Sequence, residues 1–97
     1  MIVGTIRVPV EKLEAARPAM KRVVEGSRAE AGCEEYSYAE DLVEPGRIHI
    51  VERWQDQASL DRHFLTPHIK EWRTAGAELG VHGRNLLLYE VQEGRSI

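Results

Sequence analysis

Two kinds of hydrophobic periodicity follow one another along this chain. Their order constrains the fold more than any other feature of the sequence. Period-two alternation, typical of strands, occurs in residues 2–8, 33–42, 47–54 and 84–92. A 3.6-residue period, typical of helices, occurs over residues 10–30 and again, in two parts, over 58–65 and 66–80. The order is β-α-β-β-α-β, the split βαβ arrangement. It predicts an α+β, ferredoxin-like antiparallel sheet with its helices on one face.

Length and charge narrow the class of protein. The chain has 97 residues, which is room for a single domain over 1–97, and no linker or repeat divides it. A net charge of −3 without a block of like charges argues against nucleic acid as a partner. No apolar run reaches the ~18–20 residues of a membrane helix, so no membrane is expected either. The lone Cys33 and the lack of a charged leader predict a cytoplasmic location.

Turn and capping residues mark where the elements end. Pro18 lies inside the first helical pattern and removes a main-chain donor, so we expect a kink or a late helix start. Gly32 is placed to stop that helix. Asp56 is predicted to cap the short helix over 58–65. Thr66 is predicted as the next N-cap, with Pro67 at the first helical position.

An acidic residue on the buried side of a strand is the strongest pointer to a site. Ile48, Ile50, Glu52 and Trp54 share one parity of the strand over 47–54. A carboxylate is rarely buried without a partner, and His63 lies on the inner stripe of the short helix, so we expect a Glu52–His63 hydrogen bond. Two interpretations stay open: a structural polar pair, or a carboxylate that orients a catalytic imidazole.

Two histidines are placed at opposite helix ends. His63 is near the end of one predicted helix and His68 is in the first turn of the next. Helix dipoles favour a cation at the first position and a neutral ring at the second, which makes His68 the better base. The catalytic candidates are therefore His68, His63 and Glu52. No metal site is expected, because the two histidines are separated by the Thr66–Pro67 break and no His-Glu-x-x-His motif is present.

Aromatic side chains provide candidates for the wall of a substrate pocket. Planar rings give dispersion contact together with a polar edge. The substrate-binding candidates are Trp54, Tyr36, Tyr38, Phe64 and Trp72. Core packing is the alternative for all five residues, and it is the stronger alternative for Phe64 and Trp72.

The face of the sheet away from the helices also needs a partner. Apolar residues are present on every predicted strand, and a large apolar patch is unusual on a monomer. We therefore expect a homodimer that forms through this sheet face.

Several short motifs together resemble one family over nearly the whole chain. They are Gly32-Cys33-x-x-Tyr36, Glu52-x-Trp54, the downstream His63, and Thr66-Pro67-His68. This pattern resembles the antibiotic biosynthesis monooxygenase superfamily and, within it, the small quinol monooxygenase-like proteins. The resemblance implies a dimeric α+β barrel. It also implies oxygenation of a small phenolic or quinol-like aromatic substrate, with molecular oxygen as co-substrate and no cofactor.

In such a reaction the main task of the protein is to deprotonate the substrate. Our hypothesis gives this role to His68, or to His63 backed by Glu52, in an apolar aromatic pocket. Two alternatives remain open. One is an isomerase or decomposition enzyme for a small oxidised metabolite on the same fold. The other is a non-catalytic, small-molecule-binding or stress-associated dimer.

Overall fold

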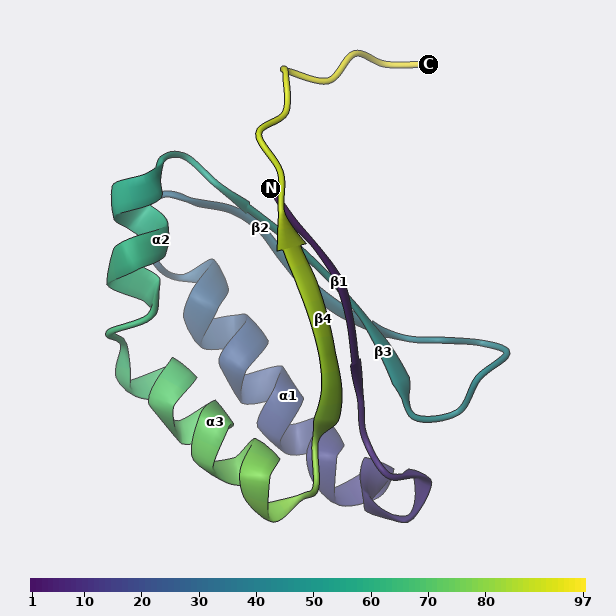
Figure 1. Ribbon diagram of the computed structural model, residues 1–97. Helices are drawn as coiled ribbons and strands as arrows, with labels where there is room; N and C mark the ends of the chain where they lie inside the picture. The colour runs from purple at the N-terminus through teal and green to yellow at the C-terminus, as the bar shows by residue number, and fades with distance from the viewer.

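The computed structural model describes residues 1–97, and its elements follow the predicted order (Figure 1). The strands are β1 (Ile2–Arg7), β2 (Cys33–Glu40), β3 (Arg47–Trp54) and β4 (His82–Leu88). The helices are the short 3-10 helix η1 (Val10–Lys12), α1 (Leu13–Arg28), α2 (Gln57–His63) and α3 (Pro67–Glu78). The predicted α+β, ferredoxin-like fold is confirmed.

The four strands form one antiparallel sheet in the order β2-β3-β1-β4. The central pair, β1 and β3, brings Ile2 opposite Glu52 and Ile6 opposite Ile48. On the other side of β3, Tyr36 of β2 lies opposite Glu52. The sheet is open at β2 and β4, so closure into a barrel would need a second copy.

One face of the sheet carries the core. α1 and α3 lie side by side over this face, and α2 covers its end (Figure 1). The predicted stripe of α1 is buried, because its apolar residues recur at helical spacing toward the sheet. The core cluster consists of Ile6, Val8, Leu13, Ala16, Ala19, Met20, Val23, Ile48, Ile50, Ile69 and Trp72.

The start of α1 and the end of β4 differ from the predicted boundaries. α1 begins at Leu13, after η1, and continues through Pro18, which is exposed. The predicted strand over 84–92 ends at Leu88 instead. After Leu88 the last contact is a pair of hydrogen bonds with the N-terminal residue. Tyr89 N–H donates to the Met1 carbonyl, and the Met1 amino group donates to the Tyr89 carbonyl. Beyond it the tail extends away from the sheet with no strand beside it (Figure 1).

Hydrogen bonds at the two ends of α2 fix the position of this helix. Asp56 caps α2 as predicted, because its carboxylate accepts from Ser59 N–H at 2.8 Å. Thr66 is the N-cap residue of α3 and Pro67 follows it at the start of the helix, as predicted. The Thr66 side chain makes no cap hydrogen bond, because its hydroxyl donates backward to the His63 carbonyl at 2.7 Å. Thr66 therefore ties the end of α2 to the start of α3, the two places where His63 and His68 lie.

The outer face of the sheet is more polar than predicted. It carries one apolar row, in which Val3 lies opposite Val51 and Leu87. Val3 and Leu87 are exposed. Most of the other residues on that parity are charged or polar, among them Arg7, Arg47, His49 and Arg53. The prediction of apolar residues on every strand of this face is met by Val3, Val51 and Leu87 on β1, β3 and β4, and on β2 only by the small Ala39. The row is narrow because most apolar strand residues share the parity that faces the helices. No helix has the length and apolar character to cross a membrane.

Candidate functional site

A cavity of about 290 Å³ lies between the sheet and the helices α2 and α3. Its wall is mostly apolar and aromatic. It includes six of the eight candidates from the sequence, namely Glu52, His63, Tyr36, Tyr38, Phe64 and Trp72. The other two, Trp54 and His68, lie outside this wall.

Glu30, in the turn after α1, is the hydrogen-bond partner of His63. His63 Nδ1 lies 2.6 Å from Glu30 Oε2, and the His63 ring is buried. The predicted Glu52–His63 hydrogen bond is absent. The reason is geometric: the end of α1 brings Glu30 against α2, whereas Glu52 accepts from Trp54 Nε1 at 3.0 Å. Sequence reasoning missed Glu30 altogether.

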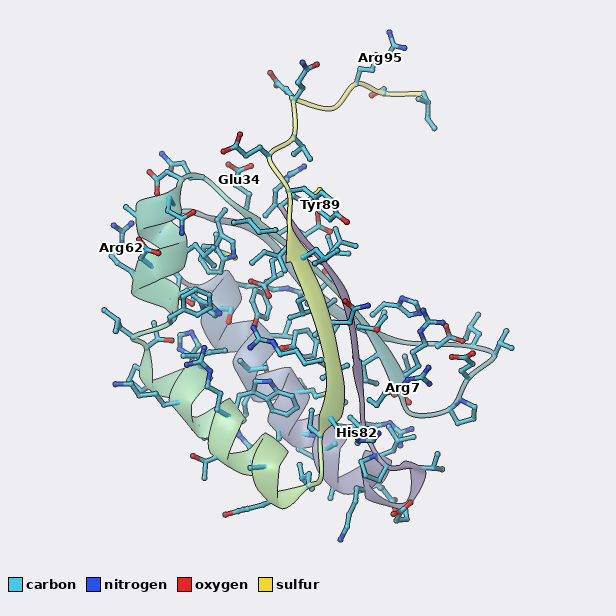
Figure 2. The ribbon with its side chains drawn as sticks, in the orientation of Figure 1. Arg7, Glu34, Arg62, His82, Tyr89 and Arg95 are labelled. Atoms are coloured by element: carbon cyan, nitrogen blue, oxygen red, sulfur yellow. The ribbon has the colours of Figure 1, made fainter.

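The Glu30 contact sets the tautomer of the His63 ring. A carboxylate only accepts, so Nδ1 carries the proton in the neutral ring and Nε2 keeps a lone pair. Nε2 has no hydrogen-bond partner within the chain, and His63 lines the cavity. Trp54 and Tyr36 hold the ring in place, with centroids 4.7 and 5.3 Å from it. The preceding Arg62, by contrast, lies on the outer side of α2 (Figure 2). The arrangement presents an oriented base to an apolar cavity.

His68 contacts Glu30 and does not line the cavity. Its Nε2 is 2.8 Å from the same oxygen, Glu30 Oε2, that binds His63. The His68 ring packs on Gly26 of α1, where a Cβ atom would come within 2.7 Å of His68 Cγ. The expectation that the Thr66–Pro67 break separates the two histidines is therefore wrong. The order in which the two rings titrate stays a prediction.

Glu52 is buried at the cavity wall, with 5% of its surface exposed. Burial raises the pKa of this carboxyl, and the Trp54 hydrogen bond together with the charges of His63 and Arg84 opposes the rise. The parity prediction for Glu52 is confirmed. The raised pKa suits a group that holds and donates a proton.

The two tyrosines face the cavity as neutral phenols. Their hydroxyl oxygens lie 3.4 Å apart and their rings stack at 5.6 Å. Burial raises the pKa of Tyr38 to about 12 and raises the pKa of Tyr36 further. Both hydroxyls therefore keep their protons at neutral pH. One hydroxyl donates to the other, which leaves the second proton for a hydrogen bond to a ligand.

Two guanidinium groups at the cavity were also missed by the sequence reasoning. Arg73 of α3 and Arg84 of β4 line the cavity, and neither forms an ion pair within the chain. Arg73 lies over the Phe64 ring at 5.5 Å. Arg84 shares the strand parity of Leu86, and this parity was a usable signal. The two residues give the cavity a positive rim.

Other hollows lack this combination of groups. One of about 350 Å³ lies along Arg28 and residues 33–37, and one of about 1100 Å³ lies beside the tail. Burial raises the pKa of the Cys33 thiol, and the charges of Glu30 and Glu52 raise it further. Cys33 is therefore a poor nucleophile, and the cavity at His63 is the candidate site.

A ferredoxin-like sheet under two helices, with an oriented imidazole at an apolar cavity, defines a small α+β domain equipped for acid–base chemistry on a small molecule. Residues 1–75 match the sequence model of the family described as antibiotic biosynthesis monooxygenase. The chain belongs to the antibiotic biosynthesis monooxygenase family. Membership suggests a small-molecule monooxygenase.

Two relatives and two solved structures are similar to this chain over most of its length. The chain is 32% identical over 74 residues to YcnE of Bacillus subtilis, named as a candidate monooxygenase, covering 76% of this chain and 78% of YcnE. It is 30% identical over its full length to the uncharacterized protein sll1783 of Synechocystis sp., of which it spans 66%. A candidate antibiotic biosynthesis monooxygenase from Deinococcus radiodurans is similar at a TM-score of 0.89 with 27% identity, covering 100% of this chain and 98% of the other. PA3566 from Pseudomonas aeruginosa is similar at a TM-score of 0.80 with 29% identity, covering 94% and 92%.

Proposed function

We propose that this chain is a cofactor-independent monooxygenase that deprotonates a phenolic or quinol-like aromatic small molecule and lets the anion react with molecular oxygen. One observation carries the proposal. The buried His63 ring is held by Glu30 at 2.6 Å, and its other nitrogen is free at an aromatic cavity of about 290 Å³.

Proton removal is assigned to His63 Nε2. The ring that accepts the proton becomes an imidazolium, and the Glu30 carboxylate at Nδ1 stabilises that charge. His68, the first candidate base from the sequence, contacts Glu30 from outside the cavity, so we assign it the support of Glu30 and not the base role. The guanidinium groups of Arg73 and Arg84 provide positive charge for the substrate anion.

The oxygen step balances without a further reductant. The deprotonated carbon of an anthrone-type ring adds O₂ to give a hydroperoxide. Loss of water then leaves a carbonyl, so one oxygen atom enters the product and the other departs as water. The conversion of CH₂ to C=O supplies the four electrons that O₂ takes up. Glu52, which holds its proton more tightly than an exposed carboxyl, supplies the proton for the departing oxygen.

Oxygen uptake with a panel of hydroquinones and anthrone-type phenols tests this function. His63→Gln should lower kcat by about 10²–10⁴-fold, the usual contribution of a general base. His49→Gln is the matched control, because His49 pairs with Asp41 away from the cavity. Absence of uptake across the panel, or full activity in folded His63→Gln, would contradict the proposal. Turnover should persist in the presence of a chelator, and a flavin spectrum in the isolated protein would also count against it.

The positive rim supports one alternative function. Arg73 and Arg84 suit a small anionic metabolite, and an isomerase would use the same base without consuming O₂. The two functions separate under nitrogen, where an isomerase keeps its turnover and an oxygenase loses it.

A further inference from the structure

We propose that Glu30, His63 and His68 form a binding site for a divalent transition-metal ion of the zinc type, and that the bound ion blocks the base. The first half rests on the geometry of these three residues. The second half rests on the proposed function, since it concerns His63 as the base of that reaction.

The three donor atoms converge from separate elements. Glu30 follows α1, His63 ends α2 and His68 is the second residue of α3. Glu30 Oε2, His63 Nδ1 and His68 Nε2 all lie within 4.8 Å of one another. Two imidazole nitrogens and one carboxylate oxygen form a ligand set typical of Zn²⁺ and of neighbouring first-row ions. Ca²⁺ and Mg²⁺ are not favoured, because they take oxygen ligands.

The spacing fits an ion after a small adjustment. Bonds of about 2.0–2.2 Å to a tetrahedral ion place neighbouring ligand atoms roughly 3.3–3.6 Å apart. The two contacts to Glu30 Oε2 are hydrogen-bond distances of 2.6 and 2.8 Å, so each must lengthen by about 0.5–1 Å when the ion enters. The side chain of His68 is 23% exposed, which gives an ion and its water ligands a route from solvent.

The surroundings keep the ligands in place. Gly26 lies in the interior of α1, where glycine is less favourable than alanine. Its missing side chain is what admits the His68 ring. Between α2 and α3, the Thr66 hydroxyl donates a hydrogen bond to the His63 carbonyl at 2.7 Å. The helix ends that carry both imidazoles are therefore anchored independently of the Glu30 contact.

A bound ion would change which His63 nitrogen carries the proton. In the metal-free site Glu30 holds the proton on Nδ1 and leaves Nε2 as an acceptor. An ion bound at Nδ1 takes that lone pair, and the neutral ring keeps its single proton on Nε2. The nitrogen at the cavity becomes a donor. The metal-bound form then has no base at that position.

Calorimetric titration with Zn²⁺ tests the site itself. We expect one ion per wild-type chain, and at least a tenfold weaker affinity in Glu30→Gln and in His68→Asn, each shown to be folded by circular dichroism. His49→Asn is the matched control and should bind as wild type, because His49 has only Asp41 as a ligand-bearing neighbour. Absence of binding at millimolar Zn²⁺, or wild-type affinity in both variants, would overturn the site.

The proton shift has its own measurement. Long-range nitrogen–proton NMR spectra of the His63 ring should show the proton on Nδ1 without metal and on Nε2 with Zn²⁺. Oxygen uptake should fall at least tenfold when the site is saturated and return on chelation. Saturation of the site with undiminished uptake would overturn the blocking role. Absence of uptake in the metal-free protein would count against the proposed function, while the titration and the spectra would still decide the metal site.

Discussion

Glu30 is the residue that organises the site, since one of its oxygen atoms contacts both His63 and His68. We expect Glu30→Gln to lower kcat for oxygen uptake by about 10–100-fold, less than His63→Gln, because the amide can still accept from Nδ1 but does not neutralise the imidazolium. Stopped-flow or electrode measurements of uptake check this. Glu25→Gln, on the exposed side of α1, is the control. Equal activity of Glu30→Gln and wild type would remove Glu30 from the mechanism.

The buried Glu52 carboxyl leads to a prediction of how the free energy of unfolding depends on pH. Because burial raises its pKa, the folded chain holds this proton more tightly than the unfolded chain does. The stabilising contribution is complete below the ordinary value of 4.5 and is lost as pH rises through the raised pKa. Glu52→Gln should therefore exceed wild type in free energy of unfolding at pH 8, and the difference should shrink toward pH 4.

Urea denaturation over that pH range measures the difference. Glu35→Gln, which removes an exposed carboxylate from β2, is the control. A wild-type chain that is the more stable of the two at pH 8 would show that the ionised Glu52 is well compensated.

Parity and helical spacing predicted part of the site from the sequence. They placed Glu52, Tyr36 and Tyr38 on the face toward the helices, and the structure agrees. Glu30 was missed because its role depends on a contact with His63, 33 positions away, and its local sequence resembles an ordinary polar turn. Trp54 has the predicted parity, yet its indole turns toward Glu52 instead of joining the cavity wall.

At the scale of elements, α1 contains a residue that destabilises the helix. Pro18 is exposed inside the helix and offers no N–H to the preceding turn. We expect Pro18→Ala to raise the free energy of unfolding by about 1–2 kcal/mol, since a regained hydrogen bond outweighs the more flexible unfolded chain. Urea denaturation measures the change. Lys21→Ala, exposed in the same helix, should stay within about 0.5 kcal/mol of wild type. A less stable Pro18→Ala would mean that the start of α1 depends on proline.

The sequence predicted element types better than element ends. Periodicity identified each strand and helix because burial on one face imposes it. The end of β4 was not predictable, because strand length depends on a neighbour: β1 begins at Ile2, and no strand lies beside residues 90–92. Thr66 is the N-cap residue that the sequence predicted, but the partner of its hydroxyl was not predictable, because that partner is the His63 carbonyl in the preceding helix.

For the whole molecule, the outer face of the sheet is the surface that the chain leaves without a helix (Figure 1). The helices form one layer on the opposite face (Figure 1). The candidate cavity lies between that layer and the sheet. The outer face carries the row formed by Val3, Val51 and Leu87, bordered by charged residues. An apolar row with a polar rim is the usual anatomy of an interface core.

We expect this row to be the centre of a homodimer interface, with Val3 in its middle. Val3→Lys would bury an unpaired charge there, diagonal to Arg53 on the neighbouring strand, and should weaken dimerisation at least a hundredfold. The isolated fold should tolerate the change, because Val3 is already 39% exposed. Sedimentation equilibrium of wild type and of Val3→Lys checks this. Ala15→Lys, on the exposed side of α1, is the control. A wild-type chain that stays monomeric at every concentration would show that a row of three residues is too small to hold two copies together, and the candidate cavity would then have to bind its ligand in a single chain.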